Sequence, residues 1–281
     1  MLSFIYGLLS AISWGAGDFA GGLASRKLSA YRAVFYSDLI GLLLIIAVSL
    51  IYREAFPAAS VIINAAIGGI LGTFGLLTLY MSLSQGRMSI AAPVSALFAA
   101  LLPVIVGLFT QGLPTLNQFI GFAFALAAIW LISQGHATER FKLEHLADLR
   151  LPLLAGLGFG GYFIFLHRAS SGSDLIFAPM IVSRTAGTLI MLFLVLMRRE
   201  SFAVPREARG VVLTNATLDV GGNLFFILAS QAGRLDVSAV LSSLYPGSTV
   251  ILAWIFLKEK ISLTQALGIS LALIAIVFFT L

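Results

Sequence analysis

The stretch VIINAAIGGILGTFGLLTLYMSL, residues 61–83, contains no charged side chain and is long enough to cross a bilayer as a helix. Similar stretches, such as residues 3–24 and 39–52, recur along all 281 residues. Because they are apolar on all sides, they differ from the one-sided helices of soluble bundles. The sequence therefore predicts an all-α transmembrane fold of about ten helices, near residues 3–24, 30–52, 61–84, 89–110, 115–134, 152–168, 175–197, 211–231, 237–257 and 262–280.

The composition excludes several classes of function. Charged residues make up 10% of the chain, whereas a soluble domain carries roughly 25%. The net charge of +5 comes from basic residues dispersed among short connections, so we expect no nucleic-acid partner. The chain has no cysteine, and its three histidines are scattered, so we predict neither a metal site nor a cofactor.

The longest polar segment, residues 136–150, divides the chain near its midpoint. We expect one five-helix repeat in residues 1–135 and a second in residues 151–281. A shift of 147 places Gly86-Arg87 on Gly233-Arg234 and aligns Leu116, Gln118 and Gly121 with Leu263, Gln265 and Gly268. Polar and glycine positions that recur in one register favour duplication over chance similarity between apolar segments.

Five helices per repeat is an odd number, so the second repeat must enter the membrane upside-down relative to the first. Inverted repeats around a central cavity are a recurrent plan of secondary transporters. If the N-terminus is outside, the outer loops hold only three basic residues, Arg53, Arg168 and Arg234. The positive-inside rule then favours both termini outside.

Two residues of the first apolar stretch, Trp14 and Asp18, are four residues apart and share one helix face. A carboxylate inside a membrane is costly and is expected to face the bundle interior or a hydrated cavity. Asp18 would then bind a proton or cargo beside an aromatic wall formed by Trp14. The alternative is a solvated Asp18 near the helix end and a Trp14 that only packs.

A polar stripe in the stretch 211–231 consists of Asn215, Asp219 and Asn223, again spaced by four. Three such side chains on one face can line a hydrated cavity. Asn also forms hydrogen bonds between membrane helices, which is the structural alternative. The carboxylate at the centre of the stripe favours the cavity.

A third charged position, Arg184, needs a carboxylate partner or an anionic ligand if it is buried. Asp18, Asp38 and Asp219 are candidate partners. Aligning Glu54 with Glu200 places Asp38 opposite Arg184, which predicts a structural ion pair between them. Arg184 orienting cargo is the alternative. Whichever of the three carboxylates pairs with Arg184, two remain unpaired, which indicates proton coupling or a cationic group on the substrate.

Several tyrosines and prolines complete the predicted site. Tyr80, Tyr162 and Tyr245 can add hydroxyl groups to a cavity, although such residues are often interface anchors. Proline kinks a helix, so we predict hinges at Pro93, Pro103 and Pro246. Proline is also more frequent in membrane helices generally, which is the alternative.

One pattern suggests an enzyme. Gly15-Ala16-Gly17-Asp18 matches the Gly-x-Gly-Asp of intramembrane aspartyl proteases, with Asp38 as the second carboxylate. The pattern is short in a glycine-rich chain, and the tyrosine that usually precedes the partner aspartate is displaced by one, at Tyr36. We therefore do not expect an enzyme.

Three short motifs follow one another in a familiar order and spacing: Trp14-Gly15 with Phe19, Gly86-Arg87 followed by Ala91-Ala92-Pro93, and Leu257-Lys258-Glu259-Lys260-Ile261 followed by Gln265 and Gly268. In these motifs the chain resembles the drug/metabolite transporter superfamily, specifically its ten-helix EamA-type permeases. The resemblance implies a carrier of amino acids, nucleobases, nucleotide sugars or drugs. Members commonly keep both termini in the cytoplasm, contrary to the loop charges here.

We therefore predict a multi-pass inner-membrane transporter that moves a small metabolite by alternating access, as a monomer or a dimer, with proton coupling left open. A channel or a membrane receptor is the alternative by class. The predicted substrate-binding residues are Trp14, Asp18, Tyr80, Arg184, Asn215, Asp219, Asn223 and Tyr245.

Overall fold

The computed structural model describes residues 1–25, 27–84, 88–133, 149–258 and 260–280. Every regular element in these ranges is a helix, as the apolar runs predict. The first half forms α1 (Leu2–Ser25), α2 (Ala30–Tyr52), α3 (Ala59–Ser84), α4 (Met88–Thr110) and α5 (Leu116–Ser133). The second half forms α6 (Arg150–Ser170), α7 (Phe177–Met197), α8 (Arg206–Ala232), α9 (Leu235–Ser242), α10 (Tyr245–Leu257) and α11 (Leu263–Thr280). Nearly all of the predicted linker 136–150, and Gly86-Arg87, lie outside the described residues.

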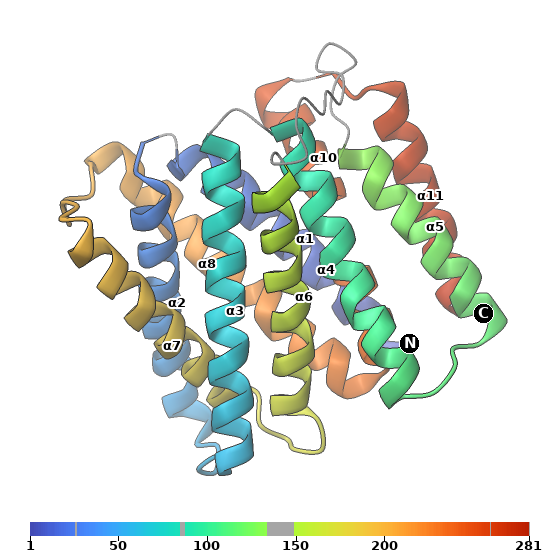
Figure 1. Cartoon of the computed structure of the whole chain (residues 1–281), viewed down its shortest axis with the longest axis horizontal. Coiled ribbons are helices and arrows are strands. Elements are labelled where there is room, and N and C mark those ends of the chain that lie inside the picture. Colours follow the sequence, from blue (N-terminus) through green and yellow to red (C-terminus); the bar gives the residue numbers. More distant parts are fainter. Residues whose placement is uncertain (26, 85–87, 134–148, 259, 281) are drawn as a thin grey trace.

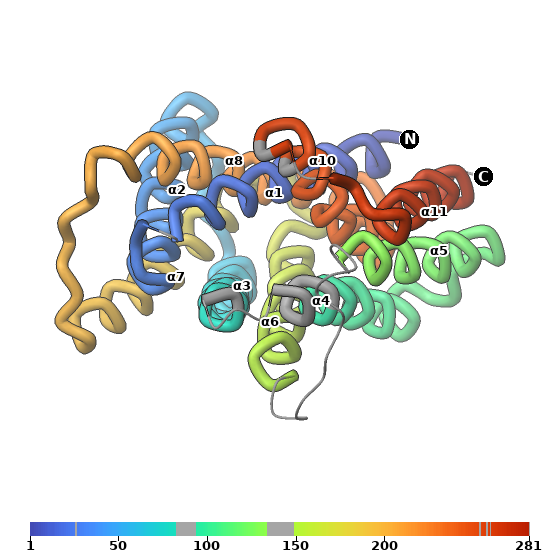
Figure 2. The backbone as a smooth tube through the Cα atoms, turned by 90° about the horizontal axis from the view of Figure 1, so that it is seen from above, coloured from blue at the N-terminus to red at the C-terminus, as the bar shows by residue number. Residues whose placement is uncertain are grey.

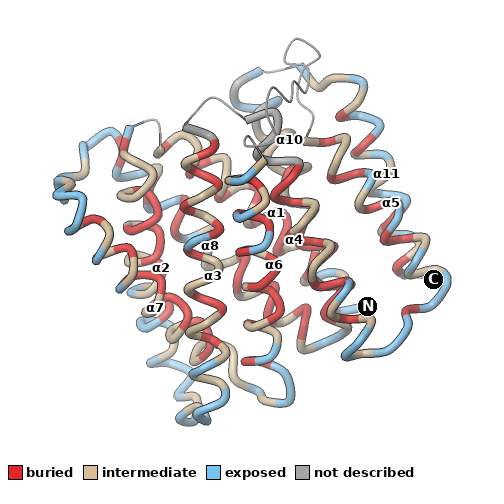
Figure 3. Tube along the Cα trace, viewed as in Figure 1, coloured by how far each residue is buried: buried red, intermediate tan, exposed pale blue. Residues whose placement is uncertain are grey.

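Seven segments within the described residues are long and apolar enough to cross a membrane: α2, α3, α5, α7, α8, α11 and the α9–α10 run. Large apolar side chains such as Leu43, Phe193 and Leu273 are about 60% exposed on the flanks of the bundle. Figure 3 shows these exposed stretches alternating with buried ones along the helices. Such a surface suits lipid, and the chain is a multi-pass membrane protein.

One predicted helix is interrupted. The run 237–257 was expected to be continuous, but α9 ends at Ser242 and α10 begins at Tyr245. Pro246 lies in the first turn of α10, where its missing N–H leaves no helical hydrogen bond unmade. Pro103, by contrast, lies inside the continuous α4. Pro93 is also in α4, but its side chain lies outside the described residues.

The helix pairs follow the expected duplication. If α1–α5 correspond in order to α6, α7, α8, α9–α10 and α11, the contact of α3 with α6 is equivalent to that of α8 with α1. The helices α2 and α7 contact each other, as do α5 and α11, so each packs against its own counterpart. Figures 1 and 2 show these pairs and place both termini near the same end of the bundle. An approximate twofold relation therefore connects two halves around a shared centre.

Candidate functional site

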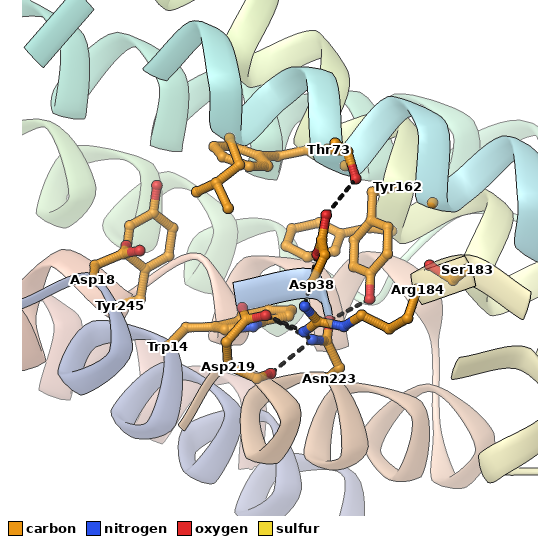
Figure 4. A pocket seen from close by; sticks show the side chains of 15 residues that line it. Trp14, Asp18, Asp38, Thr73, Tyr162, Ser183, Arg184, Asp219, Asn223 and Tyr245 are labelled. Carbon is orange, nitrogen blue, oxygen red and sulfur yellow. Dashed lines mark hydrogen bonds and ion pairs between the residues drawn. The ribbon is translucent and has the colours of Figure 1, made fainter. Parts of the chain in front are cut away.

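A cavity of about 100 Å³ lies at this shared centre, between helices of both halves. Its polar lining comes from α1, α2, α3, α6, α7, α8 and α10, so distant parts of the chain meet there (Figure 4). The residues labelled in the figure are Trp14, Asp18, Asp38, Thr73, Tyr162, Ser183, Arg184, Asp219, Asn223 and Tyr245. Phe159 and Phe163 add aromatic surface.

A charge cluster occupies one part of the cavity. Arg184 Nη1 donates to Asp38 Oδ1 at 2.8 Å, and its Nη2 donates to Asp219 Oδ2. The side chains of Arg184 and Asp38 are each only 8% exposed. Thr73 Oγ1 donates to the second oxygen of Asp38 at 3.1 Å. Arg184 thus uses its two terminal nitrogens to join α2 of the first half to α8 of the second.

Two glycines make room for this cluster. A Cβ atom on Gly187 would contact the Thr73 hydroxyl and lie 2.9 Å from Asp38 Oδ2. A Cβ atom on Gly41 would lie 3.3 Å from Arg184 Cζ. A shift of 146 relates the two glycines to each other, and the same shift relates Asp38 to Arg184. The cluster therefore lies where α2 and α7 cross each other at equivalent positions.

The polar stripe of α8 serves two different purposes. Asp219 and Asn223 line the cavity, where Asn223 Nδ2 donates to the Asp219 carbonyl at 2.6 Å and Tyr162 donates to Asn223 Oδ1. Asn215 is buried outside the lining and donates to the Gly17 carbonyl of α1 at 2.8 Å. Asn215 therefore forms a hydrogen bond between two helices, which was the structural alternative for this residue.

Tyr80 also lies away from the cavity lining. Its side chain is 4% exposed and its hydroxyl forms a hydrogen bond with Asn215. A Cβ atom on Gly21 would contact the same hydroxyl, so the tyrosine lies directly against α1. The structure therefore places Tyr80 and Asn215 in a helix interface, whereas the sequence predicted them in the cavity.

Asp18 and Tyr245 lie together at one end of the cavity, and Trp14 lies between them and the charge cluster (Figure 4). The Trp14 ring stacks on Phe163 with a centroid distance of 5.4 Å. Within the described part of the chain, no hydrogen bond or ion pair reaches the Asp18 carboxylate, and the charge acting on it is the repulsive one of Asp219. Asp18 and Asp38 thus form no shared-proton pair of the protease type, because Asp38 is bound by Arg184 and Thr73.

The sequence interpretation missed Thr73, Ser183, Phe159 and Phe163. Thr73 could have been found from the alignment of the two repeats. The shift of 146 that aligns Asp38 with Arg184 also aligns Thr73 with Asp219. The Thr73–Asp38 hydrogen bond is therefore the counterpart of the Asp219–Arg184 ion pair. No comparable signal marks the two phenylalanines among the chain's 22.

Comparisons with known proteins agree with the two-repeat architecture. The model of the EamA-like transporter family matches residues 1–134 and 149–281. An uncharacterized protein of Methanocaldococcus jannaschii is 29% identical over 132 residues, which are 47% of this chain and 96% of that protein. That relative thus has about the length of one half. A solved crystal structure superposes with a TM-score of 0.81 at 16% identity, covering 99% of this chain and 96% of that one. This match shows the fold alone.

Proposed function

Because the chain belongs to the EamA-like transporter family, we propose that it is a secondary transporter that moves a small metabolite across a cell inner membrane by alternating access. The observation that carries this proposal is the position of the charge cluster. Asp38 comes from the first half and Arg184 and Asp219 from the second, and all three line a cavity between the halves. Charges inside a bilayer are expensive, so their concentration at this point favours a solute pathway over a purely structural core.

Alternating access requires the protein to interconvert between states that open the cavity to either side. Two inverted halves provide related packings of similar energy, and the contacts between them would be exchanged when one half rocks against the other. Both α2–α7 and the equivalent pairs α3–α6 and α8–α1 cross the boundary between the halves. We propose that rocking occurs at this boundary, with the solute held next to it.

Flux measurements on purified protein in proteoliposomes test the carrier. The solutes are labelled amino acids, nucleobases and organic amines, with and without a pH gradient to detect proton coupling. A carrier gives saturable uptake that is accelerated by unlabelled solute on the far side. Linear uptake without that acceleration would establish a channel, and binding without flux would establish a receptor.

The variants Asp18→Asn, Arg184→Gln and Asp219→Asn link this flux to the cavity. We expect each to reduce uptake strongly while the protein still inserts. Asp174→Asn, which changes an exposed loop carboxylate, is the matched control and should transport normally. Full uptake in all three cavity variants would refute the proposed pathway.

A further inference from the structure

We propose that the cavity binds a small organic cation, whose charged group lies between the Asp18 carboxylate and the Trp14 indole. This inference rests on the proposed function, because it assumes that the transported solute occupies the cavity. It adds the chemical class of that solute and the part of the cavity that recognises it.

The first argument is charge. The described lining holds three carboxylates, Asp18, Asp38 and Asp219, and one cation, Arg184, so its formal charge is 1 − 3 = −2. Both terminal nitrogens of Arg184 are already bound to carboxylates. An anionic solute would have to displace one of these ion pairs while facing two further negative charges. A cavity with a net negative charge attracts cations and raises their local concentration.

The second argument is the difference between the carboxylates. Asp38 accepts from Arg184 and Thr73, and Asp219 accepts from Arg184. Asp18 lies in the apolar α1, and within the described residues it has neither a hydrogen bond nor an ion pair. A charged group away from water is costly unless it is paired. A cationic solute would supply the partner that the fold does not.

The third argument is the aromatic surface beside Asp18. The indole of Trp14 packs against Phe163, at 5.4 Å, and Phe226, at 5.9 Å between ring centroids, and these two phenylalanine rings stack on each other at 4.7 Å. Tyr245 lies at the same end of the cavity as Asp18 (Figure 4). Cations bind over the faces of aromatic rings, and tryptophan is the strongest of these partners. A carboxylate and a fixed indole that line one cavity suit an ammonium group with alkyl substituents better than a metal ion.

The test compares ligands that have the same shape and differ in charge. Choline and 3,3-dimethylbutan-1-ol differ in one atom, the quaternary nitrogen or carbon. Tetramethylammonium provides a smaller cation and benzoate an anion. Binding to the purified full-length protein is measured by isothermal titration calorimetry and by thermal shift. We expect the cations to bind at least tenfold more tightly than the neutral alcohol, and benzoate not to bind.

Variants then locate the site. Asp18→Asn preserves shape and should weaken cation binding at least tenfold. Trp14→Leu should weaken it by about tenfold and Trp14→Phe by less, because phenylalanine retains a ring face. Asp174→Asn should bind as the unmodified protein does. The ligand comparison needs no substitution, so it decides the question even if a cavity variant fails to fold.

The outcomes separate this inference from the proposed function. Equal binding of choline and the neutral alcohol, or unchanged affinity in Asp18→Asn, would overturn the cation site. Saturable counterflow of neutral or anionic solutes without cation binding would leave the carrier intact and refute the inference. Cation binding that depends on Asp18, without any flux, would support the inference and refute the carrier.

Discussion

Arg184→Gln is the substitution with the largest expected effect on stability. The guanidinium joins Asp38 and Asp219, and Asp38 lies close enough to Asp219 to be repelled by it. Removing the only cation in the described cavity lining leaves two carboxylates facing each other without compensation. Breaking a buried ion pair from one side typically costs about 3–5 kcal/mol. We expect Arg184→Gln to reach at least the lower end of that range, since both side chains of the Asp38 pair are 8% exposed.

Related substitutions should rank in a definite order. Asp38→Asn leaves Arg184 paired with Asp219, so we expect a loss of about 1.5–3 kcal/mol, the value of a hydrogen bond to a charged group. The loss of stability in Arg184→Lys should lie between those of Arg184→Gln and Asp38→Asn, because a lysine ammonium group cannot bind both carboxylates as the guanidinium group does. The double variant Arg184→Gln/Asp38→Asn should lose less than the sum, with a coupling of about 0.5–3 kcal/mol.

Thermal unfolding in one detergent, followed by circular dichroism, measures the series, with Asp174→Asn as the control for a removed charge. The coupling between positions 38 and 184 is then read from the double-mutant cycle. If Arg184→Gln unfolds at the temperature of the unmodified protein, or if the two substitutions are strictly additive, the Arg184–Asp38 ion pair does not stabilise the fold.

Three further predictions use the same unfolding measurement. Gly187→Ala places a Cβ atom 2.9 Å from Asp38 Oδ2 and should lower the free energy of unfolding by about 1–3 kcal/mol. The control is Gly22→Ala, whose Cβ atom meets nothing within 4 Å and should cause no loss. Equal stability of the two variants would contradict the close packing of Gly187 against Asp38. Glu54→Gln replaces a carboxylate that accepts hydrogen bonds from the amides of Ile176, Phe177 and Ala178 at the start of α7. We expect a loss of stability of about 0.5–2 kcal/mol and faster hydrogen exchange at those amides, with the exposed Glu207→Gln as the control. Unchanged exchange at the three amides would exclude a capping role for Glu54. The double exchange Asp38→Arg/Arg184→Asp should destabilise the protein, because Asp219 would then face a carboxylate at position 184. Adding Thr73→Asp and Asp219→Thr exchanges the two neighbouring partners as well and should restore stability. A fourfold variant that is no more stable than the double exchange would refute the repeat symmetry of the cluster.

Helix positions were predictable because polar residues must leave the lipid. The expected 30–52 coincides with α2, and the expected 262–280 differs from α11 by one residue. The expected 211–231 begins five residues later than α8, because the charged turn with Arg206, Glu207 and Arg209 reads as a loop although it is helical. Hydropathy reports where lipid begins, and a helix can continue past that point. The break between α9 and α10 was not predicted, because Ser243 and Leu244, the two residues between the helices, carry no charge that would indicate a loop.

The cavity was predictable where the side chains are charged. Asp18, Asp38, Arg184 and Asp219 all line it, because a charge inside a membrane has few tolerable surroundings. Neutral polar side chains carry less information. Asn215 and Asn223 are about 12 Å apart along α8, at 1.5 Å per residue. One is satisfied by a carbonyl of α1 and the other by Tyr162 in the cavity. Spacing identifies a shared helix face, but it does not say how far along that face the cavity extends.

The inverted repeat explains why similarity is lost at the centre of the molecule. Equivalent positions of α2 and α7 face each other there, so a charge that was the same in both repeats would meet itself and be repelled. Glycine can stay the same, as Gly41 and Gly187 do, but Asp38 has to differ from Arg184. Sequence identity between the halves is therefore a poor guide to this cavity. The register still identifies its contacts, because the shift that pairs Asp38 with Arg184 also pairs Thr73 with Asp219.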